Sequence, residues 1–119
     1  MEEKHVKEEV KRYLKSKGFT TSDGDQKIVN LLGEKVEFKG VVGVVEDKVK
    51  VYWKWDPEKN RGEISVSIYG VRGRGEEVVE SLESKGFIVE VVDDNIYGKM
   101  KFKGDGVGKL KEAVSSIKE

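Results

Sequence analysis

The sequence contains no cysteine, a single histidine and a single proline. Without cysteine the chain has no disulfide framework, no thiolate ligand for a metal and no cysteine nucleophile. The only histidine, His5, lies close to the N-terminus, which excludes a zinc site built from several histidines and most histidine-based catalysis. We therefore expect no metal, no cofactor and no set of catalytic residues.

Long apolar runs are also missing from the sequence. No segment approaches the roughly 20 consecutive apolar residues that a membrane-spanning helix needs. The first ten residues, MEEKHVKEEV, are rich in charge and lack the apolar core of a signal peptide. We expect a cytoplasmic protein with no membrane partner.

Charged residues are abundant and balanced. The 119 residues include 23 acidic and 23 basic ones, so the net charge is zero, and 36% of the residues are hydrophobic. A chain of this length supports one hydrophobic core, which predicts a single domain over residues 1–119. The neutral total argues against a protein that coats nucleic acid in bulk. The many Lys, Glu and Val residues give the archaeal-like composition that is typical of hyperthermophile proteins.

A helical hydrophobic period occurs in three segments of the sequence. Over residues 2–17, Val6, Val10 and Leu14 fall on one face of a helix. A second helix is predicted over residues 75–85, and a third follows near the C-terminus. Its apolar stripe consists of Val107, Leu110, Val114 and Ile117.

The segment between residues 20 and 34 allows several interpretations. Ser22 followed by Asp25 resembles a helical capping box, and three apolar residues would share one helical face, namely Ile28, Leu31 and Leu32. A strand or a loop is equally compatible with the same residues. The sequence therefore leaves helix, strand and loop open for this segment.

From residue 35 onward the hydrophobic period switches to two. Apolar residues alternate over residues 36–44, 49–55 and 64–68, with turn residues between the runs. We predict an antiparallel meander of three strands and, after the second helix, a hairpin over residues 87–102. The expected fold is α+β, a single domain of order α-βββ-α-ββ-α whose antiparallel sheet is packed with helices.

Two parts of the chain resemble each other. EEVKRYLKSKGF at residues 8–19 and EEVVESLESKGF at residues 76–87 share eight of twelve residues, and KVEFKG at 35–40 is similar to KMKFKG at 99–104. One interpretation is a duplicated α-β-β unit over residues 8–40 and 76–104. The other is that a Lys-Gly-Phe helix end recurs by chance in a chain rich in Lys and Glu.

A basic, aromatic hairpin is the strongest candidate for a binding surface. Residues 48–74 carry seven basic and three acidic side chains, whereas residues 76–94 carry one basic and seven acidic side chains. Alternation places lysines and a tyrosine on one face of the strand at 49–55, a composition found in sheets that bind single-stranded nucleic acid. Trp55, near the strand end, is expected to be half exposed. The candidate surface consists of Lys48, Lys50, Tyr52, Lys54, Trp55, Arg61, Tyr69, Arg72 and Arg74.

Two further motifs are interpreted as structural. The glycine-rich stretch at 102–109 leads into a helix, but Asp105 would repel a phosphate there, so we predict that Asp105 is the helix N-cap. Asp23-Gly24-Asp25 begins like a calcium loop, yet Lys27 occupies the next ligand position.

Together these features predict a non-enzymatic binding or adaptor domain. The missing catalytic residues, the segregated charge and the aromatic hairpin favour a protein partner or a homodimer. The alternative is a nucleic-acid-binding protein that uses the hairpin at 48–74. The discriminating feature is whether the acidic second helix covers that surface. An enzyme is the third hypothesis, and it would need a buried pair of carboxylates in a cleft.

Overall fold

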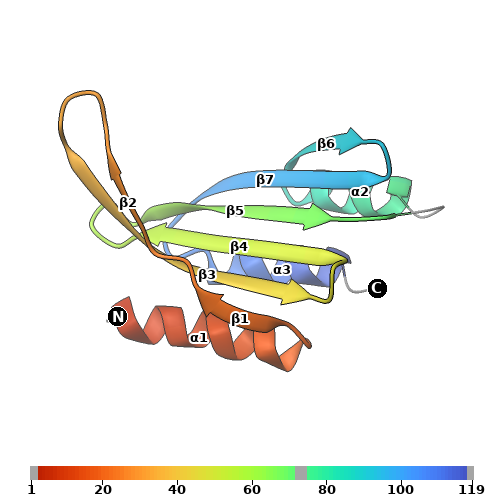
Figure 1. Ribbon diagram of the computed structural model, residues 1–119, viewed down its shortest axis with the longest axis horizontal. Helices are drawn as coiled ribbons and strands as arrows, with labels where there is room; N and C mark the ends of the chain where they lie inside the picture. Colours follow the sequence, from red (N-terminus) through yellow and green to blue (C-terminus); the bar gives the residue numbers. More distant parts are fainter. Residues whose placement is uncertain (1–2, 72–74, 118–119) are drawn as a thin grey trace.

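A computed structural model describes residues 3–71 and 75–117 of the chain (Figure 1). It has the predicted order α-βββ-α-ββ-α, with two short strands added between the first helix and the meander. Among the described helices, none is long and apolar enough to cross a membrane. The elements are α1 (Glu3–Ser16), β1 (Thr20–Asp23), β2 (Gln26–Val29), β3 (Lys35–Val45), β4 (Val49–Asp56), β5 (Arg61–Ile68), α2 (Gly75–Ser84), β6 (Ile88–Val92), β7 (Asn95–Lys103) and α3 (Val107–Ile117).

The seven strands form an antiparallel sheet of order β1-β3-β4-β5-β7-β6, and β2 pairs with β3 beside this path. The predicted meander corresponds to β3, β4 and β5, and the predicted hairpin corresponds to β6 and β7. Strand β3 is long enough to serve two partners, because residues 35–38 pair with β2 and residues 41–44 pair with β1. As a result the β2–β3 hairpin extends beyond the neighbouring strands (Figure 1).

The hydrophobic core lies on one face of the sheet, under the three helices. The predicted alternation of buried apolar residues along β4 and β5 is confirmed. Val51, Trp53, Ile64 and Val66 are all at most 1% exposed. Each such aliphatic side chain contributes about 1.5–3 kcal/mol when it leaves water. The helices cover this face with their apolar stripes, which include Val6, Val10, Leu14, Leu82, Leu110 and Val114. The opposite face of the sheet carries no helix among the described elements, and we call it the open face.

The two similar helix ends have the same geometry. Phe19 N donates to Leu14 O at 3.0 Å, and Phe87 N donates to Leu82 O at 3.1 Å. The glycine between them is left-handed in both, with φ of 92° at Gly18 and 98° at Gly86. This is the glycine C-cap that ends a helix and turns the chain into a strand.

The strands that follow these two helix ends also pair with their neighbouring strands in the same way. Thr21 of β1 pairs with Gly43, and Val89 of β6 pairs with Gly98, so each glycine lies beneath the preceding Leu and Phe side chains. The matching units are thus α1-β1-β3 and α2-β6-β7. The second pair of similar segments is not equivalent, because residues 35–40 lie inside β3 whereas residues 99–104 run past the end of β7. A common origin of the two units by duplication stays a prediction.

Residues 20–34 are extended and form β1, β2 and a turn. The sequence pattern left this segment open because its apolar residues match a helical face. Pairing with β3 selects the extended state, since β3 offers both strands a ladder of hydrogen-bond partners.

Candidate functional site

The open face brings together most of the predicted surface residues. Lys50, Tyr52 and Lys54 project from β4 on the side opposite to Val51 and Trp53, as the alternation predicts. Three more predicted residues extend this face. Arg61 is the first residue of β5, Tyr69 directly follows its last residue, and Lys48 lies in the turn before β4.

One predicted residue does not join this surface. Trp55 lies on the covered face of β4, is 5% exposed, and donates from Nε1 to Asn60 Oδ1 at 3.0 Å. The expected half exposure of Trp55 is therefore not found. Arg72 and Arg74 lie outside the residues that the structure describes.

Strand β7 supplies members of the open face that the sequence reasoning missed. It pairs directly with β5, so Tyr97 lies opposite Ser67, Lys99 opposite Ser65, and Lys101 opposite Glu63. Tyr97 also meets Tyr69 edge to face, with ring centroids 6.2 Å apart. Alternation over residues 95–103 indicates which side chains share a face, but only the sheet order places that face beside β5.

The acidic helix α2 leaves the open face uncovered. Leu82, its buried residue, packs beneath β7, where a Cβ added at Gly98 would meet Leu82 Cδ1 at 3.6 Å. Gly98 continues the row of Val51 and Val66 across the sheet, which is the helix-covered side. Because α2 lies behind the sheet, its carboxylates do not mask the lysines of the open face.

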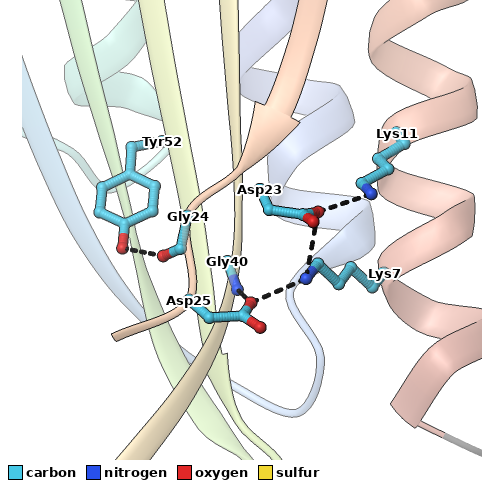
Figure 2. Close-up of polar contacts among 7 residues, drawn as sticks. All are labelled: Lys7, Lys11, Asp23, Gly24, Asp25, Gly40 and Tyr52. Carbon is cyan, nitrogen blue, oxygen red and sulfur yellow. Dashed lines mark hydrogen bonds and ion pairs between the residues drawn. The ribbon is translucent and has the colours of Figure 1, made fainter. Parts of the chain in front are cut away.

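Tyr52 is committed to a structural role on this face (Figure 2). Its hydroxyl donates to Gly24 O at 2.5 Å, and a Cβ added at Gly24 would lie 2.9 Å from Tyr52 Cε1. The chain between β1 and β2 therefore crosses directly over the ring. Burial, and then the charge of Asp25, raise the pKa of Tyr52 above 10.0. A ring covered in this way is not available to stack on a nucleic-acid base.

Asp23 and Asp25 hold the same crossing against α1 (Figure 2). Lys7 Nζ lies 2.8 Å from Asp25 Oδ1 and 3.2 Å from Asp23 Oδ1, and Lys11 Nζ lies 2.6 Å from Asp23 Oδ1. Gly40 N donates to Asp25 Oδ1 at 2.9 Å. We call these contacts the α1 clasp.

The carboxylates of the calcium-like motif are thus paired with lysine ammonium groups, in keeping with the structural interpretation of this motif. Within residues 3–71 and 75–117, no group of three or more His, Cys, Asp or Glu side chains is placed to hold a metal ion.

The α1 clasp predicts a loss of stability in acid. Hydrogen bonds from Lys11 and Lys7 lower the pKa of Asp23 below 3.8. Burial opposes the charge of Asp25, but hydrogen bonds from Lys7 and Gly40 bring its pKa below 3.8 as well. A carboxylate whose pKa is lower in the folded chain contributes stability above its unfolded pKa, and this stability disappears as the pH falls through the folded value.

We therefore expect Lys7→Met to flatten the decline of unfolding free energy in acid. The measurement is urea denaturation at a series of pH values from about 6 down to about 2.5. The matched control is Lys27→Met, because the Lys27–Glu37 pair is 3.8 Å apart and its side chains are 82% and 60% exposed. Parallel pH curves for Lys7→Met and the wild type would contradict the role of the clasp.

The glycine-rich turn before α3 caps the helix, but the N-cap position falls on Gly106, whose carbonyl oxygen accepts the first intrahelical hydrogen bond from Leu110 N at 2.9 Å. Asp105 lies one residue before the N-cap, so its predicted assignment is wrong by one position, and its Oδ1 accepts a hydrogen bond from Val107 N at 3.0 Å in an Asx turn. Trp53 Nε1 donates to Asp105 O at 2.7 Å and ties the turn to the core. A groove of about 840 Å³ runs beside the turn, between Trp55 and Pro57 on one side and Lys109 and Glu112 on the other.

The β2–β3 hairpin exposes a cluster of large apolar side chains that the sequence reasoning did not identify as a site. Asn30 builds its turn, because Asn30 Oδ1 accepts hydrogen bonds from Leu32 N and Glu34 N, each at 2.9 Å. The apolar side chains take no part in these hydrogen bonds. Their exposed fractions are 41% for Ile28, 63% for Val29, 106% for Leu31 and 84% for Leu32. We call these four residues the hairpin tip.

Comparison with known proteins finds no matching family model, no matching curated protein and no matching solved structure.

Proposed function

We propose that this protein is a non-enzymatic binding protein, an adaptor that associates with a second copy of itself through the β2–β3 hairpin. The exposed hairpin tip is the observation that carries the proposal. Soluble proteins tolerate single exposed apolar residues, but a contiguous group is typical of an interaction site.

The isolation of the hairpin supports the same proposal. Over residues 26–38, β2 pairs only with β3 in the described structure. A two-stranded ribbon is marginally stable in water, and a third strand or a packing partner stabilises it. Each copy of the hairpin would supply that partner to the other.

The charge of the hairpin favours a second copy as the occupant. Residues 26–38 carry two lysines and two glutamates, so their net charge is zero. A two-fold interface places the same surface on both sides, which requires a patch that does not repel itself. An apolar tip on a ribbon of zero net charge meets that requirement.

Self-association is tested by the double variant Leu31→Glu/Leu32→Glu. At roughly 100 µM, where a micromolar dimer is populated, we expect the wild type to approach twice the chain mass of 13.4 kDa. The variant should stay at 13.4 kDa, because four added carboxylates would face one another across the interface. Sedimentation equilibrium measures both masses.

The control is Ile88→Glu/Val91→Glu, which places the same charges on exposed apolar residues of β6. The two parent side chains are 79% and 59% exposed. This control should keep the wild-type mass. A wild type that remains at 13.4 kDa, or a control that dissociates equally, would contradict self-association through the hairpin.

The uncovered open face favours a second candidate function, binding of single-stranded nucleic acid. Lys50, Lys99 and Lys101 would meet phosphates, and Tyr97 beside Tyr69 would stack on a base. Tyr52 takes no part because its ring is covered.

This second function is tested by fluorescence anisotropy with labelled single-stranded oligonucleotides at about 50 and 200 mM salt. We expect affinity that falls with salt and that Lys50→Ala/Lys101→Ala weakens about tenfold or more. The equally charged control, Lys109→Ala/Lys111→Ala on α3, should bind like the wild type. Absence of binding at the lower salt rejects this function and leaves the adaptor proposal untouched.

A further inference from the structure

Strand β6 forms an outer edge of the sheet and is unusually apolar for that position. It pairs with β7 alone among the described strands. Ile88, Val91 and Val92 are 79%, 59% and 49% exposed, and Glu90 is its only charged residue. Edge strands are normally protected from pairing by lysine, proline or a bulge. Strand β6 carries no lysine or proline.

The opposite edge of the same molecule shows that the fold does not require an apolar edge. Strand β1 follows the same type of helix end as β6 and occupies the equivalent position beside its glycine-containing neighbour. Its sequence is Thr-Thr-Ser-Asp, where β6 reads Ile-Val-Glu-Val-Val. Thr20 corresponds to Ile88, and Asp23 corresponds to Val91. Since polar residues suffice at one edge, the apolar residues of the other edge indicate a role beyond folding.

The two sides of β6 offer different surroundings to an added strand. On the helix-covered side, a groove of about 720 Å³ separates α2 from the β6–β7 hairpin. Val79, Val91 and Ile96 give it an apolar lining, and carboxylates of α2 and of the turn at residues 93–94 also line it. On the open side, Ile88 and Glu90 border a hollow of about 370 Å³ beside Tyr97 and Lys99. An added strand would thus place alternate side chains into a carboxylate-lined groove and onto an apolar hollow.

The charge of this region selects the kind of partner. Residues 76–94 carry seven acidic side chains and one basic side chain. Two copies of β6 paired antiparallel about their centres would set Glu90 opposite Glu90 and bring both acidic regions together, which is unfavourable. Charge complementarity instead favours a segment that carries lysine or arginine.

We propose that the β6 edge and the adjoining groove bind an extended, basic and apolar segment of a different protein, which adds to the sheet as an antiparallel or parallel strand. Backbone hydrogen bonds to the unpaired edge would give affinity, and basic side chains toward α2 would give specificity. This site is separate from the hairpin tip, so it does not depend on self-association.

The test is a titration of the full chain with synthetic peptides of about six residues that alternate valine and lysine. Isothermal calorimetry should detect micromolar binding at about 50 mM salt that weakens at about 200 mM. A valine and glutamate peptide should bind at least about tenfold more weakly. N-methylation of alternate amides in the lysine peptide keeps its charge but removes edge hydrogen bonds, and it should abolish binding.

A protein variant separates strand addition from simple charge attraction. Ile88→Thr/Val91→Thr leaves the net charge unchanged and gives β6 the polar character of β1, and it should weaken peptide binding about tenfold. The control Val29→Thr makes the same kind of change at the hairpin tip and should leave binding unchanged. Circular dichroism checks that both variants are folded, and Leu31→Glu/Leu32→Glu should still bind the lysine peptide. Undiminished binding to Ile88→Thr/Val91→Thr, equal binding of the N-methylated peptide, or no binding of the lysine peptide would overturn the proposal.

Discussion

Trp53→Ala is expected to lower the free energy of unfolding by about 3–5 kcal/mol. Trp53 is 0% exposed and is the largest fully buried side chain of the core. Its ring lies 6.2 Å from that of Trp55, between the sheet and the turn that leads into α3. Truncation would leave a cavity at this junction and remove the hydrogen bond from Nε1 to Asp105 O.

Trp53→Phe separates these two contributions. The phenyl ring fills most of the space but cannot donate to Asp105 O, so we expect a loss of about 1–3 kcal/mol. Urea denaturation followed by circular dichroism measures both variants, and Trp55 still reports tertiary packing by fluorescence. If Trp53→Ala lost less than about 1 kcal/mol, the central role of this side chain would be wrong.

The second large effect is expected for Gly106→Ala, also measured by urea denaturation. Gly106 has φ of 70°, and a Cβ there would lie 2.5 Å from Phe102 Cε1 and Cζ. Phe102 is 6% exposed, so its ring has little room to move. Backbone strain and overpacking together predict a loss of about 2–5 kcal/mol.

Two neighbouring glycines provide matched controls for this prediction. Gly104 has φ of 83° but no atom within 4 Å of an added Cβ, so Gly104→Ala should cost only about 1–2 kcal/mol of strain. Gly108 lies in the first turn of α3 with open space around it, and Gly108→Ala should be neutral or stabilise by up to about 1 kcal/mol. Equal losses for Gly104→Ala and Gly106→Ala would show that the contact with Phe102 carries no penalty.

The candidate surface illustrates how far local patterns reach. Alternation along β4 correctly separates Lys50, Tyr52 and Lys54 from Trp53. The same alternation puts Trp55 on the core side, and there it is buried beside Trp53 and donates to Asn60 although it lies near the strand end. Nothing in the pattern indicates that Gly24 crosses Tyr52 and removes its ring from the surface.

The hairpin tip shows the converse limit. Ile28, Leu31 and Leu32 have the spacing of a buried helical face, yet they are among the most exposed large apolar residues of the described chain. The spacing of apolar residues indicates which side chains of a segment could be buried together. Whether they are buried depends on which other segment packs against them. Here β3 pairs with the backbone of β2 and no described element covers the turn.

The sequence by itself determined the type and order of the main helices and strands, the structural role of the turn at Asp105, and the separation of a basic segment from an acidic one. These are local properties, because helical and extended backbones impose different side-chain periods over a few residues. Tertiary structure alone decided that β7 lies between β5 and β6, that α2 leaves the open face uncovered, and that an apolar tip and an apolar edge stay exposed. These features depend on contacts between residues far apart in the chain, which the packing of one shared core selects and no local period encodes.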